Sequence, residues 1–98
     1  MEKMYVIIVQ EYDDHYVVGV AHSVNAAENW VDENLREVLD LEDEAIIKRY
    51  SSEWQRLTYS DCYPYSDCYV KQIDVQLQPG PGYDESWDIC IEPCKLVG

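Results

Sequence analysis

Between Tyr69 and Gln78, a mainly apolar set of side chains alternates with a mainly polar set, and this alternation predicts a β-strand. Successive side chains of a β-strand point to opposite faces, so strict alternation is typical of a half-buried strand. One face carries the larger and more apolar set: Tyr69, Lys71, Ile73, Val75 and Leu77. The segment Ser86–Glu92 alternates in the same way and places Trp87, Ile89 and Ile91 inward.

Two further strands are predicted near the start of the chain. Met4–Tyr12 and His15–Ala21 are rich in β-branched and aromatic residues, and a short acidic break separates them, as in a β-hairpin. Apolar residues occupy both faces of the first strand, so we expect it to be central and buried on both sides at its start. Gly19 inside the second strand predicts a bulge or a close approach of another group.

Two helices are predicted in the middle of the chain. The first begins at Ser23 or Asn25, and its apolar stripe extends to Leu39 with helical spacing. The second extends from about Asp43 to Leu57, although Ala45–Ile47 can also be interpreted as strand. A loop formed by the repeat YSDCY-P-YSDCY (59–69) and a turn at 79–82 complete the chain. The expected fold is a single α+β domain over residues 1–98. Its order is ββααββ, with a mainly antiparallel sheet and one or two helices on one face.

Charge limits the classes of partner. The 98 residues contain 20 Asp and Glu against 7 Lys and Arg, a formal net charge of −13. Such a chain repels nucleic acid and anionic membranes, so we expect direct binding to neither, and it attracts basic surfaces. The alternative is that the charge serves solubility alone, although it exceeds the magnitude of about 2–8 typical of a well-behaved small domain.

The acidic side chains are concentrated in the helical segment. Glu33 and Glu37 are four residues apart, and on a helix such neighbours lie about 5–6 Å apart, close to the charge spacing of a nucleic-acid strand. One interpretation is a face that mimics phosphates, and the other is a solvated acidic face. The Tyr-rich loop adds a second recognition surface, because Tyr and Ser are favoured in binding loops. The candidate partner-binding residues are Glu28, Asp32, Glu33, Glu37, Asp40, Asp43, Glu44, Tyr63 and Tyr65.

The four cysteines allow several interpretations. Cys62, Cys68, Cys90 and Cys94 form two pairs near turns, and four thiolates are a zinc ligand set. Their spacing does not match the common zinc motifs, so free thiols are the favoured interpretation, with zinc and a disulfide as alternatives. We therefore expect no cofactor.

The sequence shows no arrangement that predicts catalysis. A phosphate-binding Gly-rich loop, a nucleophile elbow and a zinc-protease motif are all missing from the sequence, so we expect a protein that acts by binding and not as an enzyme. The first apolar run, Met4–Val9, is shorter than a secretory core of ~7–15 residues and far shorter than a membrane span, which predicts a cytoplasmic location.

The first 35 residues or so resemble a group of small phage and mobile-element proteins of unknown function. The matching positions are Tyr5, Val6, Glu11, Tyr12, Gly19, Val20, Ser23, Ala27, Glu28, Trp30 and Val31, while His22 stands where those proteins have Phe. The resemblance implies a phage or prophage origin, and small acidic phage proteins are similar in size and charge to anti-CRISPR and anti-restriction inhibitors. It carries over no functional residue.

The resulting hypothesis is a phage-encoded inhibitor that binds a host protein at its basic nucleic-acid-binding surface. The main alternative is a small structural or adaptor module, dimeric through a sheet edge or stapled by zinc, in which the charge serves only solubility. A third hypothesis is a dimeric binder of a small signalling molecule, which the negative charge disfavours if that molecule is an anion.

Overall fold

The computed structural model describes residues 4–11, 14–51, 53–57 and 68–94. Its strands are β1 (Met4–Glu11), β2 (Asp14–Ala21), β3 (Ile46–Tyr50), β4 (Gln55–Leu57), β5 (Cys68–Gln76) and β6 (Asp84–Cys94). Its helices are α1 (Val24–Glu33) and α2 (Leu35–Val38). The predicted α+β class is confirmed.

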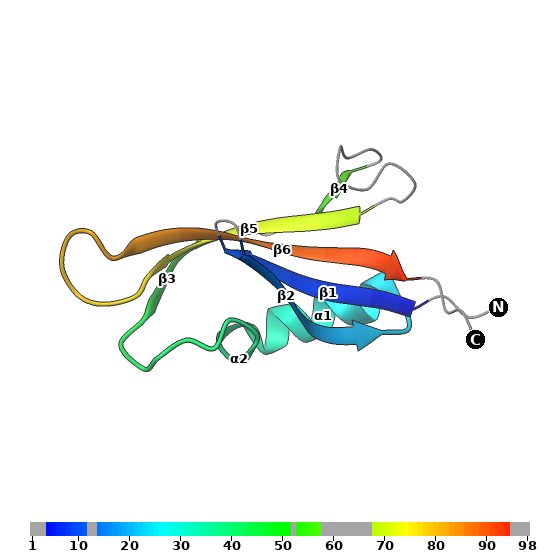
Figure 1. The fold of residues 1–98 in the computed structure, drawn as a ribbon, viewed down its shortest axis with the longest axis horizontal. Coiled ribbons are helices and arrows are strands. Elements are labelled where there is room, and N and C mark those ends of the chain that lie inside the picture. The colour runs from blue at the N-terminus through cyan, green and yellow to red at the C-terminus, as the bar shows by residue number, and fades with distance from the viewer. Residues whose placement is uncertain (1–3, 12–13, 52, 58–67, 95–98) are drawn as a thin grey trace.

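All described strand pairs are antiparallel and form one sheet in the order β2-β1-β6-β5-β3, with β4 also pairing with β5. Both described helices lie on the same side of this sheet (Figure 1). No described helix covers the opposite face of the central strands, which we call the uncovered face. The arrangement has two edges, with β2 at one and β3 and β4 at the other.

The core lies between the helices and the sheet. Its side chains come from the inward face of each central strand and from the buried stripe of the helical segment. They are Ile7, Val9, Ala27, Val31, Leu35, Val38, Leu39, Ala45, Ile73, Val75, Trp87, Ile89 and Ile91. The alternating patterns in β5 and β6 therefore predicted the correct inward faces.

The prediction that β1 is a central strand is confirmed, since it lies between β2 and β6, but the prediction that it is buried on both sides at its start is wrong. Ile7 and Val9 are buried against the helices, but Val6 and Ile8 point to the uncovered face and are only half-buried. Apolar residues on both faces of a strand thus do not require two covering layers, because folded proteins leave much apolar surface in contact with water.

The prediction of a second helix over 43–57 is also wrong. Ile46–Tyr50 and Gln55–Leu57 are strands that pair with β5, so the element order over the described residues is ββααββββ. Two adjacent β-branched residues, Ile46 and Ile47, favour a strand, and the edge of β5 offers backbone groups that must find hydrogen-bond partners. These two effects outweigh the helical spacing of the apolar residues.

Local signals in the hairpins were more reliable. The register of β1 with β2 shifts between Ile7 and Ile8, which is the bulge that Gly19 predicted. A Cβ on Gly19 would lie 3.2 Å from Cζ3 of Trp30, so a side chain there would force the ring to move. In the turn between β5 and β6, Gly80 and Gly82 have φ of 113° and 91°, values that favour glycine.

Candidate functional site

The acidic segment starts at a well-formed helix N-terminus. Ser23 is the N-cap of α1, and its hydroxyl accepts a hydrogen bond from the Ala26 amide at 3.0 Å. This contact satisfies one of the free amides of the first turn. Ala27 and Val31 then face the core, which directs the carboxylates of α1 outward or toward the rim of the sheet.

The helix breaks at Asn34, where one continuous helix was predicted. Asn34 follows the last residue of α1, and its side-chain amide donates to the Trp30 carbonyl at 2.9 Å. Asn competes for backbone groups in this way and so favours helix ends. Glu33 and Glu37 consequently lie on two different helices, and the regular row of carboxylates expected on a single helix is not formed.

Arg36 ties the segment after α2 to the helix. Its guanidinium donates to the carbonyl oxygens of Glu42 at 2.8 Å, Ala45 at 2.9 Å and Asp43 at 3.5 Å. The cation is therefore bonded to backbone carbonyls, while the carboxylates around it point to solvent. The chain reverses at Asp40, whose φ of 52° is left-handed, a conformation that Asp tolerates better than most residues.

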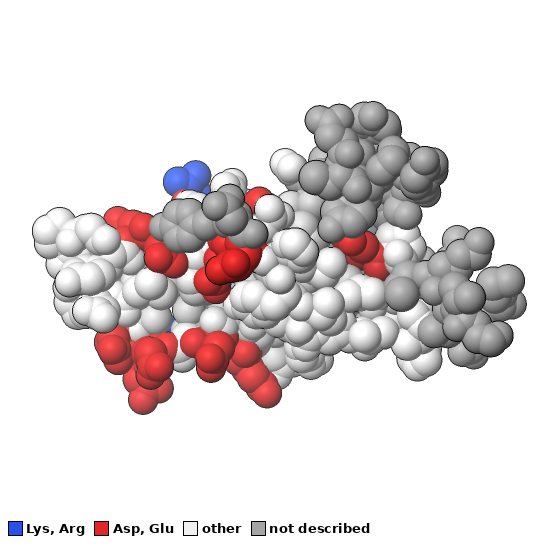
Figure 2. All heavy atoms as spheres, in the orientation of Figure 1, with Lys and Arg blue, Asp and Glu red and all other residues white. Residues whose placement is uncertain are grey.

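We call the exposed carboxylates of this region the acidic surface. Its members are Glu33, Glu37, Asp40, Glu42, Asp43 and Glu44, all of them exposed. None of their carboxylates forms an ion pair or hydrogen bond with another described side chain. Figure 2 shows acidic side chains gathered along the lower edge of the molecule, over α2 and the segment that leads to β3. Glu42 belongs to this surface, although sequence reasoning placed it only at the start of a helix.

Two predicted binding residues, Glu28 and Asp32, lie apart from this surface, on the α1 side that faces β5. Glu28 is half-buried, and burial is the main reason that its pKa is raised. Asp32 is engaged in a cluster with Lys71, described next. Tyr63 and Tyr65, the predicted loop residues, lie outside the described residues.

Lys71 is buried to 2% exposure and was not singled out by sequence reasoning. Its Nζ lies 3.1 Å from Oδ1 of Asp32, 4.2 Å from the centre of the Tyr50 ring and 4.9 Å from that of Trp54. Tyr50 donates its hydroxyl to the same Asp32 oxygen, and burial together with this bond raises the pKa of Tyr50. Trp54 Nε1 is buried without a hydrogen-bond partner among the described residues. A carboxylate and two aromatic faces thus replace the lost hydration of the ammonium.

The sequence contained one signal for this cluster. Lys71 sits on the inward face of an alternating strand, between Tyr69 and Ile73, where a cation requires a buried partner. The partner of Lys71 could not be identified from the sequence, because Asp32 is 39 residues away and Tyr50 was assigned to a helix.

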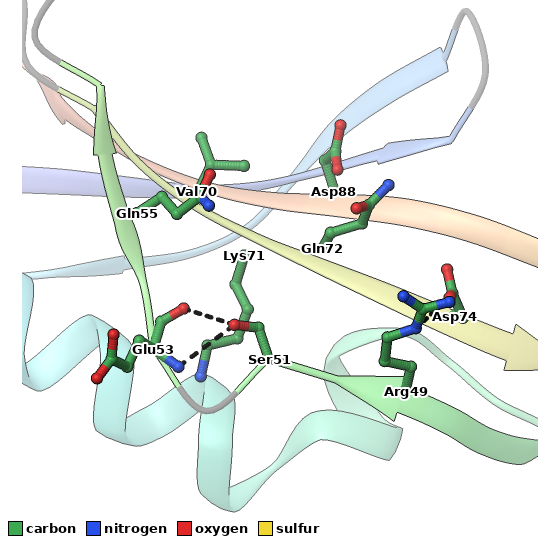
Figure 3. A pocket seen from close by; sticks show the side chains of 9 residues that line it. All are labelled: Arg49, Ser51, Glu53, Gln55, Val70, Lys71, Gln72, Asp74 and Asp88. Carbon is green, nitrogen blue, oxygen red and sulfur yellow. Dashed lines mark hydrogen bonds and ion pairs between the residues drawn. The ribbon is translucent and has the colours of Figure 1, made fainter.

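A polar pocket lies at the break between β3 and β4. Figure 3 shows Gln72 and Asp88 on the face of the sheet away from the helices, while Lys71 points the other way. At the rim, Arg49 pairs with Asp74 at 3.0 Å, and the pocket lining is mostly polar. Burial raises the pKa of Asp88. The side chains that line the pocket can both donate and accept hydrogen bonds.

The structure describes the side chains of two of the four cysteines, Cys68 and Cys90. Cys68 and Cys90 lie on neighbouring strands, and burial, with smaller contributions from Glu92 and Asp88, raises the pKa of Cys90 to about 12. Cys62 and the side chain of Cys94 lie outside the described residues. In the part of the chain that is described, no three His, Cys, Asp or Glu side chains are grouped so that they could hold a metal ion.

Comparison with known proteins identifies no relative. No family model matches the sequence, and searches of curated proteins and of solved structures find no match. Within the described residues, neither helix has the length and apolar character needed to cross a membrane.

Proposed function

We propose that this protein is a non-catalytic inhibitor that occupies a basic, nucleic-acid-binding surface on another protein. The acidic surface makes the contact, and the protein acts by blocking access to that surface. The observation that carries the proposal is the state of the carboxylates. Six exposed carboxylates occur within the twelve residues from Glu33 to Glu44, and the only cation among these residues, Arg36, is bonded to backbone carbonyls.

Unpaired charges of one sign at this density repel one another and so oppose folding. A partner of opposite charge relieves this repulsion, which favours formation of the complex. They also steer a basic partner during diffusion and accelerate association at low salt. Because the helix breaks at Asn34, the carboxylates form a cluster at a corner of the molecule instead of a long row. A cluster fits a compact basic patch, such as a site that holds a few phosphates, better than a long nucleic-acid groove.

The kind of partner is proposed from two observations made on the sequence. A net charge of −13 favours a strongly basic target, and nucleic-acid-binding proteins present such surfaces. The N-terminal resemblance to phage proteins supports a host defence protein of the CRISPR or restriction type. The contact involves no chemical step, because none of the carboxylates of the acidic surface has an acid or base partner among the described side chains.

The test is a charge reversal with a matched control. Glu33→Lys/Glu37→Lys changes two members of the acidic surface, while Glu53→Lys/Asp84→Lys makes the same change in net charge at exposed positions elsewhere. Each tagged variant is used to capture proteins from nuclease-treated bacterial lysate. We expect the wild type and the control to capture similar amounts of the same nucleic-acid-binding protein. The surface variant should capture at least about tenfold less of it.

Equal retention by both double variants would show that the protein responds to its total charge and not to this surface. Circular dichroism establishes that both variants are folded before the comparison is made. Capture that survives high salt unchanged in the wild type would also contradict an electrostatic contact, because contacts between exposed charges are screened by salt.

A further inference from the structure

The exposed apolar side chains of this molecule are not scattered. Six large apolar side chains are exposed among the described residues, and four of these lie on or against the edge strand β2. They are Tyr16, Val17, Val20 and Trp30. Val17 and Val20 are 60% and 55% exposed, and Trp30 reaches β2 from α1 by packing over Gly19. These side chains gather at one edge of the sheet, with Tyr16 and Trp30 on the helix side and Val17 and Val20 on the uncovered side. Exposed apolar side chains that include Tyr and Trp are typical of an interaction surface.

The two edges of the sheet differ in their protection against pairing. The other edge is formed by two short strands, β3 and β4, and carries Lys48, Arg49 and Arg56, which are exposed charges of the kind that block strand addition. Strand β2 pairs with β1 alone in the described structure, and from Tyr16 to Ala21 it has neither a charge nor a proline. Its bulge increases the twist of the edge but leaves Val17 and Val20 exposed.

The charge pattern identifies which partner fits this edge. Two copies of a chain with a charge of −13 repel each other, so they can meet only where the surface lacks carboxylates. From Val17 to Ala21 the strand is such a place, since its own carboxylate, Asp14, stands at its start and the neighbouring Glu11 and Asp40 lie toward Tyr16. In an antiparallel pair of β2 strands, each Asp14 lies beside the Ala21 end of the other copy. The two carboxylates are then about 24 Å apart at ~3.4 Å per residue, well beyond the screening length of ~8 Å.

We propose that two copies of this protein associate through antiparallel pairing of their β2 strands, which extends the sheet across a twofold axis. Apolar side chains then line both faces of the junction. Tyr16 stands opposite the buried Val9, so it lies with Trp30 on the helix side, while Val17 stands opposite Ile8 on the uncovered side. The Tyr16 hydroxyl donates to Glu11 at 3.0 Å, which holds that ring at the edge.

Salt affects this association in the opposite direction from the binding of a basic partner. Salt screens the repulsion between two acidic chains, so it strengthens the dimer, whereas it weakens a contact between the acidic surface and a basic protein. The two proposals rest on different residues and can therefore fail independently. If both hold, the dimer presents two acidic surfaces to one partner or to two.

The experiment is sedimentation equilibrium of the full chain over a series of protein and salt concentrations. Wild-type protein is expected to approach twice the 11.5 kDa of the chain as either concentration rises. Val17→Lys/Val20→Lys is expected to remain at 11.5 kDa and folded under all conditions. The control Ile46→Lys/Tyr83→Lys adds the same charge at the other two exposed apolar positions and should dimerise like the wild type.

A wild type that stays monomeric at millimolar concentration and high salt overturns the proposal. So does a Val17→Lys/Val20→Lys variant that dimerises as well as the control. Hydrogen exchange of the wild type gives a second readout that needs no variant. Amides of residues 15–21 should exchange more slowly as protein concentration rises, and exchange there that is independent of concentration contradicts the pairing of β2 strands.

Discussion

The Lys71 ammonium depends on three side chains that the fold brings to it. A charge with 2% exposure is strongly destabilising unless it is paired, and its carboxylate partner here is Asp32 at 3.1 Å. The Asp32 side chain is 42% exposed to solvent, so the pair is asymmetric: the ammonium has lost its hydration and the carboxylate is still partly hydrated. Removal of one partner should therefore have a different effect from removal of the other.

Asp32→Ala is predicted to lower the free energy of unfolding by about 3 kcal/mol, because it leaves Lys71 buried without a counter-ion. Lys71→Met keeps the apolar stem and leaves only a partly hydrated carboxylate, so its effect should be clearly smaller. The double variant should recover most of the loss caused by Asp32→Ala. Urea unfolding of the four proteins checks this, with Glu33→Ala as an exposed control on the same helix. Equal losses in both single variants would contradict the asymmetry.

Cys90 lies opposite Ile8 on the uncovered face of the sheet. Burial raises the pKa of its thiol from 9.0 to about 12, so the reactive thiolate is scarce at neutral pH. We expect alkylation of Cys90 at pH 7.5 to be more than about tenfold slower than that of free cysteine. Peptide mapping by mass spectrometry separates it from the other cysteines. A rate equal to that of free cysteine would mean that the site is more open than described.

At the scale of elements, the segment after α2 owes its position to Arg36 more than to its own secondary structure. The three carbonyl oxygens that accept from this guanidinium come from residues that are neither helix nor strand. Because the segment after α2 carries four of the six carboxylates of the acidic surface, the shape of that surface depends on a cation beneath it.

Arg36→Met is expected to lower the free energy of unfolding by about 1.5–3 kcal/mol, since hydrogen bonds to a charged group are lost. Arg49→Met removes the same charge from an exposed pair with Asp74 and should lower it by less than about 1 kcal/mol. Chemical denaturation of both variants makes the comparison. Similar small losses would show that the carbonyl contacts of Arg36 contribute little.

The elements also show what the sequence could predict. Alternation found the inward faces of β5 and β6, and Gly19 marked the bulge in β2, because both signals are local. The segment that contains Ile46 and Tyr50 was assigned wrongly, because its strand character depends on the edge of β5, more than twenty residues later. For the same reason the partners of Lys71 could not be predicted. Of the candidate site, the outward carboxylates were predictable, but the break at Asn34 that turns a row into a cluster was not.

For the whole molecule, partly buried carboxylates add to the effect of the net charge. Burial is the main cause that raises the pKa values of Glu28, Asp88 and Glu92. A carboxyl group with a raised pKa binds a proton more readily in the folded state than in the unfolded state. The stability that these groups contribute is therefore fully present below their unfolded pKa values and is lost as pH rises through the raised folded pKa values. Protonation also reduces the repulsion within the folded chain.

Scanning calorimetry at constant ionic strength should give a higher melting temperature at pH 5 than at pH 7.5. Asp88→Asn/Glu92→Gln should reduce this difference, because two of the responsible groups no longer titrate. Glu53→Gln/Asp84→Asn removes the same charge at exposed positions and should reduce it less. A wild-type melting temperature that is lower at pH 5 than at pH 7.5 would contradict the raised pKa values of these carboxyl groups.

The central claim concerns the acidic surface, and competition tests it most directly. The captured partner is bound to the immobilised protein, and the partner's own nucleic acid is then added in increasing amounts while bound partner and bound nucleic acid are both measured. Exclusive binding predicts that added nucleic acid releases the partner from the immobilised protein. No nucleic acid should then be retained together with the partner that is still bound. A stable ternary complex, with partner and nucleic acid held together on the immobilised protein, would contradict the claim.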